Sequence, residues 1–390
     1  MSKLLEQINT AERKTYSIKD FGRVVTGKTP SKDRPDEWGG GVDFITPTDI
    51  KTDDKFYINH NRKLSDVGED RFERMIVPPN SILVTCIGTI GKVIMNKDKA
   101  LTNQQINTVV VENEGFDRDY AFYRILSLVP LIKSLAIGST MPIINKSAFE
   151  EIEFEAPDLL TQNKISSILS AYDAKIENNN GIIKNLETMA QTIFDEWFIN
   201  FRFPGYEKAK FVDSELGEIP EGWEVLKLGD IFDIKYGRNL PTSQISIRGS
   251  FPVYGAGGVI GFYEKKNVDE KVILITCRGN GSGTIWRTNG EGFVTNNSFI
   301  ILPSDNFNYI NFISTYFLLK NSNISSALSG SAQPQITIDG LSPVETVFPQ
   351  RELLDGFQRS TTAMFNLIDK LLEENIFLKL QRDQLLKKLI

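Results

Sequence analysis

The chain contains two copies of one pattern, and this duplication limits its possible folds more than any other feature of the sequence. The matched segments occur in the same order in both halves, at offsets of about 190 to 210 residues: 18–21 (IKDF) with 228–231 (LGDI), 82–88 (ILVTCIG) with 273–279 (ILITCRG), 101–104 (LTNQ) with 294–297 (VTNN), and 138–142 (GSTMP) with 330–334 (GSAQP). This offset is several times the period of roughly 20 to 50 residues that marks a repeat array. The sequence therefore predicts two copies of a whole domain.

A helical pattern follows each copy of the domain, because glycine and proline become rare and apolar residues recur at spacings of three and four. The first helix is predicted at about residues 159–198, with its apolar stripe at Ile165, Ile168, Tyr172, Ile176, Ile182, Leu186, Met189 and Ile193. The second is predicted at about residues 351–390. Its stripe is Phe357, Met364, Ile368, Leu371, Leu378, Leu385 and Leu389, with Thr361, Asn375 and Arg382 at the intervening positions.

Neither helix can bury such a narrow stripe by itself, although a helix of this length would extend for about 60 Å. The simplest partner of each helix is the other copy, which predicts an antiparallel coiled pair with a globular domain at each end. Asn179 and Asn375 occupy equivalent positions in the two copies, where a buried asparagine fixes the register of a helix pair at some cost in stability. Ordinary domain-packing helices are the alternative, which the length and the duplication disfavour.

We expect an α+β fold with a pseudo-two-fold internal repeat, in which two similar mixed α/β domains are joined by two long antiparallel, coiled-coil-like helices. The segment 201–223 is predicted to be a linker because it carries prolines at 204 and 220 and glycines at 205, 217 and 222. The predicted boundaries are 1–157 for the first domain, 158–200 for the first helical spacer, 201–223 for the linker, 224–349 for the second domain and 350–390 for the second helical spacer.

The composition excludes several kinds of site. One histidine and two cysteines without a Cys-x-x-Cys pair cannot supply the usual zinc ligands, and Cys86 and Cys277 each end an apolar run typical of a buried strand. No apolar run reaches the roughly 20 residues of a membrane span, and residues 1–10 lack the layout of a secretory signal, so we expect a cytoplasmic protein without a membrane partner. The formal net charge of −6 counts against indiscriminate coating of nucleic acid but leaves sequence recognition open.

Several segments resemble one known family, and the resemblance covers essentially the whole chain. They are Trp197-Phe198 followed by 201–204 (FRFP), the stretches 214–217 (SELG) and 219–223 (IPEGW), and the signature D-x-x-I/L-E-x-N that begins at Asp173 and again at Asp369. These features resemble the specificity subunits of Type I restriction-modification systems. In that family each half holds a target recognition domain followed by a helical spacer, and the two spacers pack antiparallel.

The resemblance also implies partners and cofactors. It implies that this chain is not an enzyme by itself and holds no cofactor or metal, because S-adenosylmethionine, ATP and magnesium are expected in partner subunits. The implied partners are double-stranded DNA, two methyltransferase subunits that dock on the spacers, and motor-nuclease subunits that complete the restriction complex.

Two diverged heads should recognise a split, asymmetric DNA target with a gap of fixed length, because the segments that follow the matched strands differ: 87–92 is IGTIGK and 278–283 is RGNGSG. Loops after these strands carry the donors that pair with base edges, Arg with guanine and Asn or Gln with adenine. The candidate DNA-binding residues are Lys28, Thr29, Lys92, Asn103, Gln104 and Gln105 in the first domain, and Tyr236, Arg238, Asn239, Arg278, Asn280, Asn296 and Asn297 in the second. Each of them alone is better explained as a turn residue that satisfies local backbone groups, and the set is a stronger candidate than any single member.

Alternative functions remain open. Residues 22–29 (GRVVTGKT) satisfy the Walker A string of a P-loop nucleotide-binding protein, but Pro30 and Pro35 interrupt the helix that a phosphate loop must open. Residues 77–80 (VPPN) differ on both sides of the prolines from the Asp/Asn-Pro-Pro-Tyr/Phe segment of adenine methyltransferases. An architectural coiled-coil adaptor with protein-binding heads is the other alternative, with Tyr254, Phe262 and Tyr263 as its aromatic anchors.

Overall fold

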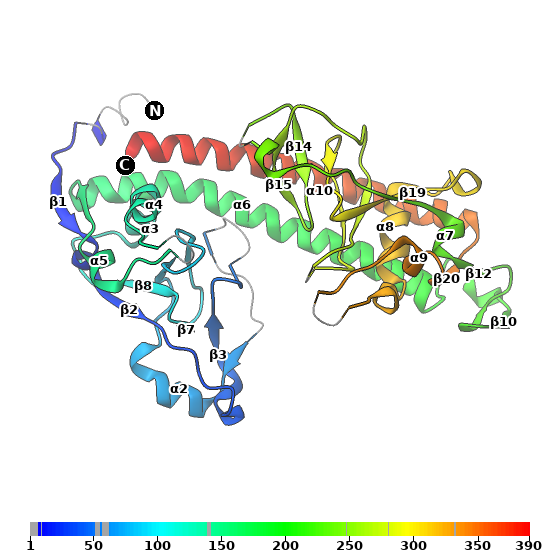
Figure 1. Cartoon of the computed structure of the whole chain (residues 1–390), viewed down its shortest axis with the longest axis horizontal. Coiled ribbons are helices and arrows are strands. Elements are labelled where there is room, and N and C mark those ends of the chain that lie inside the picture. Colours follow the sequence, from blue (N-terminus) through cyan, green and yellow to red (C-terminus); the bar gives the residue numbers. More distant parts are fainter. Residues whose placement is uncertain are drawn as a thin grey trace. The chain divides into compact units, whose positions relative to one another are not determined.

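Two long α-helices follow the two mixed domains in the computed structural model (Figure 1). Helix α6 covers Leu159–Phe194 and continues into a π-helical turn, Asp195–Ile199, and helix α10 covers Arg351–Leu389. The chain divides into two units, and each long helix contributes to both of them: unit 1 is Met1–Asn180 with Glu373–Ile390, and unit 2 is Gly181–Leu372. The structure describes residues 7–8, 10–50, 55–56, 62–138, 142–246, 248–279, 281–330 and 333–390.

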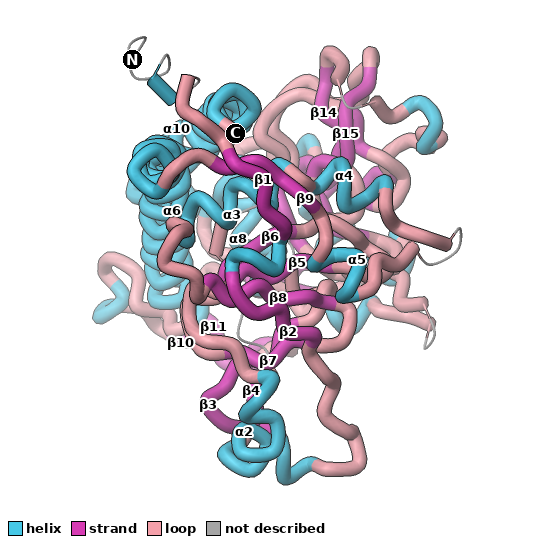
Figure 2. The backbone as a smooth tube through the Cα atoms, turned by 90° about the vertical axis from the view of Figure 1, so that its left-hand side faces the viewer, coloured by secondary structure: helices cyan, strands magenta, loops and turns pink. Residues whose placement is uncertain are grey.

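The globular part of unit 1, named head 1, contains three small sheets (Figure 2). Their strand orders are β2-β8-β5-β6, β4-β3-β7 and β1-β9, and all neighbouring strands are antiparallel except β3 and β7. The strands are β1 (Lys14–Ser17), β2 (Gly22–Thr26), β3 (Trp38–Ile45), β4 (Lys63–Leu64), β5 (Ile82–Thr85), β6 (Val93–Met95), β7 (Ala100–Thr102), β8 (Ile106–Val111) and β9 (Glu153–Ala156). The helices are α2 (Asp66–Phe72), α3 (Arg118–Ser127), α4 (Val129–Ser134) and α5 (Lys146–Glu150), with 3-10 turns η1 (Ile18–Phe21), η2 (Pro35–Glu37) and η3 (Glu73–Met75).

The globular part of unit 2, named head 2, repeats this topology strand for strand. Its sheets have the orders β13-β19-β16-β17, β15-β14-β18 and β12-β20, with β14 and β18 parallel. The strands are β12 (Glu224–Lys227), β13 (Phe232–Tyr236), β14 (Phe251–Tyr254), β15 (Val259–Tyr263), β16 (Ile273–Thr276), β17 (Ile285–Arg287), β18 (Phe293–Val294), β19 (Ser298–Pro303) and β20 (Glu345–Phe348). The helices are α7 (Leu228–Ile231), α8 (Phe312–Asn321) and α9 (Ile338–Leu341), with 3-10 turns η6 (Thr242–Gln244), η7 (Asp305–Phe307) and η8 (Ile324–Ala327). The predicted α+β fold with an internal repeat is confirmed.

The central strand of each head is apolar throughout because it separates two cores. Ile82 and Val84 of β5 lie in the core that also contains helix α3, whereas Leu83 faces a second core on the opposite side of the sheet. In head 2, Leu274 of β16 likewise lies in a different core from its neighbours Ile273 and Ile275. Alternate residues of a strand point to opposite faces, so burial of both faces requires the continuous apolar run seen in the sequence.

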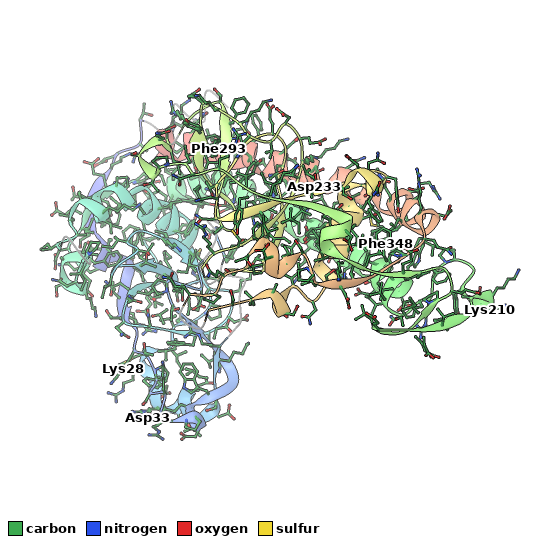
Figure 3. All side chains as sticks on the ribbon, turned by 45° about the vertical axis from the view of Figure 1, so that its right-hand side comes forward. Lys28, Asp33, Lys210, Asp233, Phe293 and Phe348 are labelled. Atoms are coloured by element: carbon green, nitrogen blue, oxygen red, sulfur yellow. The ribbon has the colours of Figure 1, made fainter. Side chains whose placement is uncertain are left out.

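The segment 201–223, predicted to be a linker, is folded. It contains the 3-10 turn η5 (Tyr206–Lys208) and an antiparallel hairpin of β10 (Phe211–Ser214) and β11 (Gly217–Pro220), beside which Lys210 is exposed (Figure 3). Ile219 and Trp223 lie in the main core of unit 2. The segment is therefore anchored at its end by buried apolar side chains, while the exact domain boundaries stay a prediction.

In unit 1 the two long helices meet through a cluster of amide side chains. Asn179 Nδ2 donates to Asn375 Oδ1 at 2.9 Å, and Asn375 Nδ2 donates to Asn180 Oδ1 at 2.9 Å. Both Asn179 and Asn375 are buried. Asp173 of α6 pairs with Arg382 of α10, so residue numbers fall along one helix as they rise along the other, and the helices are antiparallel.

In unit 2 the same helices pack through aromatic rings. The ring centroids of Phe194 on α6 and Phe357 on α10 lie 5.5 Å apart, and both rings are buried. Phe317 of α8 lies 5.5 Å from Phe194 and 5.4 Å from Phe357. Such ring pairs contribute roughly 0.5–1.5 kcal/mol each beyond the burial of their area, so this cluster holds helix α8 of head 2 against the helix pair.

The buried face of α6 differs by one position from the predicted stripe. Met189 is 51% exposed whereas Ala190 is 0% exposed, so the prediction that Met189 lies in the buried stripe is wrong. The same shift buries Ile183 and leaves Ile182 half-buried. The shift is confined to the part of α6 in unit 2, where Ile183 and Ala190 lie in the core that also contains Phe317 of α8.

The residues predicted to pack between the helices are either buried or half-buried. Those that are buried are Ile176, Asn179, Ile368, Leu371 and Asn375, together with Thr361 and Arg382. Those that are half-buried are Ile168, Tyr172, Leu186, Ile193, Leu378 and Leu385. None of the helices in the described residues is both long enough and apolar enough to cross a membrane.

A buried ion pair joins α6, α10 and head 1. Arg382 Nη1 donates to Asp173 Oδ1 at 2.5 Å, and the Tyr123 hydroxyl of α3 donates to the other oxygen of Asp173. Burial lowers the pKa of Arg382, but Asp173 raises it through charge and hydrogen bonding, and its pKa lies above the ordinary value. Burial and then the charge of Asp173 raise the pKa of Tyr123. Arg382 therefore stays charged and Tyr123 stays a donor.

Replacement of Asp173 by leucine should destabilise the protein by about 3–5 kcal/mol, because it leaves the buried Arg382 without its carboxylate. The double replacement Asp173→Leu with Arg382→Leu should cost less than Asp173→Leu alone. Free energies of unfolding from urea titration measure both effects. Lys97→Ala is the control, since it removes an exposed pair with Glu177 that should contribute less than about 1 kcal/mol. A cost for Asp173→Leu no larger than that of the control would contradict the prediction.

Candidate nucleic-acid interface

Three loops of head 1 converge after the strands that the sequence repeat singled out. The loop after β2 meets the loop after β7, because a Cβ added to Gly27 would lie 1.9 Å from the carbonyl oxygen of Thr102. The Thr29 hydroxyl donates to Gln104 Oε1 at 2.8 Å across the same contact. The loop after β5 joins them, since the Cys86 amide donates to the carbonyl of Gln105 at 2.8 Å. The predicted residues Thr29, Gln104 and Gln105 are thus brought together.

Lys28 and Gln104 are the most available predicted residues of head 1, because both are exposed. The Lys28 side chain points away from the head (Figure 3), and it makes no hydrogen bond or ion pair with any residue that the structure describes. An ammonium in this state can contact a phosphate or a base edge without first breaking an internal interaction.

Two other predicted residues of head 1 have structural partners. Asn103 is buried, and its side chain accepts a hydrogen bond from the Gln105 amide at 3.1 Å and donates to Gln105 Oε1 at 2.9 Å. The Lys92 ammonium donates to the carbonyl oxygen of Ile50 and, at 3.5 Å, to that of Pro47. Asn103 therefore shapes a turn, and Lys92 braces the segment after β3.

The equivalent loops of head 2 converge in the same way. The Arg238 amide donates to the carbonyl of Val294 at 2.9 Å, and the Asn296 amide donates to the carbonyl of Arg238 at 3.1 Å. The Cys277 amide donates to the carbonyl of Asn297 at 2.9 Å, which joins the loop after β16 to the loop after β18. These backbone contacts leave the side chains of the loop residues available.

The predicted residues of head 2 are mostly exposed. Asn296 is half-buried, and the exposed ring of Tyr236 lies 4.8 Å from the buried ring of Phe299, between centroids. Asn280 lies outside the described residues. Exposed side chains without a hydrogen bond or ion pair anywhere in the described part of the chain are Arg238, Asn239, Arg278 and Asn297. Head 2 therefore offers guanidinium and amide groups beside one another.

The two cysteines that follow the matched strands are expected to be unreactive thiols. Burial raises the pKa of Cys86 to about 11 and also raises the pKa of Cys277. A thiol with a raised pKa stays protonated at neutral pH, where it behaves as a small apolar group. Across the ranges that the structure describes, no group of three His, Cys, Asp or Glu side chains is arranged to hold a metal ion.

The Walker A string does not form a phosphate loop. Gly22–Thr26 is strand β2, paired along its whole length with β8, and the glycine that follows packs tightly on the carbonyl of Thr102. A phosphate loop needs free backbone amides that lead into a helix N-terminus. The strand therefore excludes the P-loop alternative for this segment.

One part of the head 2 site was missed by the sequence reasoning. The hairpin tip, residues 255–260, consists of the turn between β14 and β15 and the first two residues of β15. It contacts segments that adjoin the site, because the Ser298 hydroxyl donates to the carbonyl of Gly255 at 3.0 Å and the Thr276 hydroxyl donates to the carbonyl of Ala256. The string GAGG at 255–258 was the available signal, since glycine-rich pairs between two strands predict a hairpin.

Comparison with known proteins relates nearly the whole chain to one protein family. Residues 11–188 and 220–374 match the family model described as the Type I restriction modification DNA specificity domain. The Type I restriction enzyme MjaIX specificity subunit of Methanocaldococcus jannaschii is 28% identical over 96% of this chain and 91% of the relative. The HindI specificity subunit of Haemophilus influenzae is 33% identical over 39% of this chain and 34% of the relative. The crystal structure of a Type I restriction-modification S subunit from M. genitalium covers 98% of this chain and 97% of its own, with a TM-score of 0.54 at 19% identity, which supports the fold.

Two glycines, one in each head, should be important for the stability of the fold, because each lies where two loops are in contact. A Cβ on Gly27 would lie 1.9 Å from the Thr102 carbonyl oxygen, and a Cβ on Gly237 would lie 2.2 Å from that of Thr295. We expect Gly27→Ala and Gly237→Ala each to destabilise the protein by about 1–3 kcal/mol, as overpacking does. Urea unfolding measures this cost.

Matched controls exist in both heads. Gly41 in head 1 and Gly290 in head 2 have no atom within 4 Å of an added Cβ, so their alanine variants should unfold as the parent does. Equal stability of Gly27→Ala and Gly41→Ala would show that the loop contact is unimportant.

Proposed function

The chain belongs to the Type I restriction-modification DNA specificity family, and from this premise we propose that each head recognises one half of a bipartite DNA target whose intervening base pairs are not contacted. It is a specificity subunit, the non-catalytic recognition component of a Type I restriction enzyme. We propose further that the helix pair sets the number of base pairs between the half-sites. The continuity of α6 and α10 through both units supports this role.

The observation that carries the proposal is that both heads have the same strand order but different chemistry on the same three loops. Head 1 presents Lys28, Thr29, Gln104 and Gln105, whereas head 2 presents Arg238, Asn239, Arg278 and Asn297. Arg pairs with guanine in the major groove, and Asn or Gln pairs with adenine. The two half-sites should therefore differ, which makes the target asymmetric.

The remaining candidate residues are proposed to support the loops. Lys92 and Asn103 already bind groups within head 1, and Asn296 is half-buried between Arg238 and the start of β19. In head 2, the exposed ring of Tyr236 is proposed to stack on a sugar or base. A base contact by Asn280 stays a prediction.

An exposed apolar stripe on α10 is proposed to dock a methyltransferase subunit. Ile376, Phe377 and Leu380 lie on neighbouring turns and are each more than half exposed. Large apolar side chains gathered on a surface helix indicate a protein interface. In this proposal S-adenosylmethionine binds to the docked subunit, and ATP and magnesium bind to motor-nuclease subunits, so that no cofactor is held by this chain.

The architectural adaptor has less support from the geometry. Of its three aromatic anchors, Tyr254 is buried, and the ring of Tyr263 lies 5.4 Å from Phe293, between centroids. Phe262 is 36% exposed. A protein-binding head needs a cluster of exposed anchors at its centre, and these three residues do not form one.

The decisive experiment maps methylated adenines after the chain is combined with its methyltransferase subunit and S-adenosylmethionine. We expect a bipartite asymmetric motif with a gap of one length. In Arg278→Ala the requirement for guanine at one position of one half-site should relax by about 1–3 kcal/mol, and the other half-site should be unchanged. Single-molecule sequencing of genomic DNA gives the motif of each variant.

Lys265→Ala is the control for this experiment, because Lys265 is an exposed cation after the far end of β15. It should leave the motif unchanged. Simultaneous change of both half-sites in Arg278→Ala, or a symmetric motif in the parent, would refute the assignment of one half-site to each head.

Replacement of Ile376, Phe377 and Leu380 by serine should abolish co-purification with the methyltransferase subunit. Each buried apolar side chain contributes roughly 1.5–3 kcal/mol, so affinity should fall at least about 100-fold while urea unfolding is unchanged. Leu160→Ser is the matched control, since Leu160 is an exposed leucine at the start of α6. Retention of the subunit by the triple variant would place the docking site elsewhere.

A further inference from the structure

The hairpin tip of head 2 exposes two apolar side chains. Val259 and Ile260, the first residues of β15, are each 51% exposed. The tip is closed by a hydrogen bond from the Gly255 amide to the Gly258 carbonyl at 2.8 Å. A Cβ on Gly255 would lie 2.7 Å from Ile260 Cγ2, so glycine allows Ile260 to pack close against the turn. Val259 and Ile260 are therefore held by a short turn that is closed by a hydrogen bond.

The tip lies beside the residues proposed to contact bases. Ser298, whose hydroxyl donates to the Gly255 carbonyl, directly follows Asn297. Thr276, whose hydroxyl donates to the Ala256 carbonyl, stands two residues before Arg278. The amide of Thr295 donates to the carbonyl of Tyr254 at 3.0 Å, which joins the start of the tip to the loop after β18. The backbone of the tip is thus hydrogen-bonded to segments that directly adjoin Asn297 and Arg278.

The start of the equivalent segment of head 1, residues 46–49, is polar apart from one proline. It follows β3, the counterpart of β14, and it also contacts the loop after β7, since the Asn103 amide donates to the Ile45 carbonyl at 3.0 Å. There the Thr46 and Thr48 hydroxyls lie 2.9 Å apart, and Arg62 pairs with Asp49 at 2.8 Å. Among the described residues between β3 and β4 of head 1, no exposed pair of apolar side chains corresponds to Val259 and Ile260.

We propose that Val259 and Ile260 contact the C5 methyl group of thymine in the half-site recognised by head 2. This inference rests on the proposed function. The thymine methyl is the apolar feature of a base edge in the major groove, where Arg and Asn side chains read guanine and adenine. Arg278 and Asn297 are exposed, and they stand within two residues of Thr276 and Ser298, whose hydroxyls donate to the backbone of the tip. Donors and an apolar pair on adjoining segments match a half-site that contains both guanine and thymine.

The test replaces thymine by deoxyuridine, which lacks only the methyl group. Duplexes carrying the mapped target, with one thymine of the head 2 half-site replaced at a time, are titrated with the complex of the chain and its methyltransferase subunit at constant salt. Loss of one buried methyl should weaken binding about fourfold at one or two positions. In the variant Val259→Ser with Ile260→Ser, thymine and deoxyuridine duplexes should bind equally.

Controls separate this proposal from the proposed function. Lys265→Ala should retain the parent's preference for thymine, and the serine variant should leave the other half-site unchanged. A parent complex that binds both bases equally at every position, a half-site without thymine, or a preference that survives in the serine variant would each overturn the methyl contact. Those results would leave the effect of Arg278→Ala intact, whereas failure of the proposed function would remove it.

Discussion

The ion pair between Asp173 and Arg382 occupies a place in unit 1 where an ordinary helix pair would carry leucine, and the arrangement there depends on it. A buried charge is tolerated when its partners satisfy it, and here Tyr123 takes the second carboxylate oxygen. Because Tyr123 belongs to α3, the same contacts join head 1 to both helices. A shift of α6 by one helical turn along α10 would leave these charged groups unpaired. It would also break the hydrogen bond between the amides of Asn179 and Asn375.

Both heads share a topology, and each packs on the helix pair through an apolar core. Head 1 adds the buried hydrogen bond from Tyr123 to Asp173, whereas the core of head 2 includes the rings of Phe194, Phe317 and Phe357. In both heads the strands before two of the three loops are buried along their whole length: β5 and β7 in head 1, and β16 and β18 in head 2. These loops are therefore supported by rigid backbone. Loop residues can therefore diverge without loss of the fold, and recognition of two different half-sites follows from one architecture.

A chain with a net charge of −6 can still recognise DNA because some of its cationic side chains form ion pairs within the protein and others do not. Many exposed cations, such as Lys19 and Lys266, are paired with neighbouring carboxylates. In contrast, the side chains of Lys28, Arg238 and Arg278 have no ion pair within the described ranges, and they lie on the loops after the matched strands. Local potential at these loops, rather than total charge, then governs the contact with DNA.

The sequence by itself determined the duplication, the order of the matched segments along the chain, the two long helices and several of the exposed loop residues, because repeats and apolar periodicity are local signals. Only the tertiary structure decided that Met189 is exposed, that Lys92 and Asn103 bind internal groups, and that the hairpin tip with exposed Val259 and Ile260 is hydrogen-bonded to Thr276. Those outcomes depend on contacts between segments far apart in the chain, where a rotation of one residue on a helix or the packing of a hairpin tip changes which side chains meet solvent.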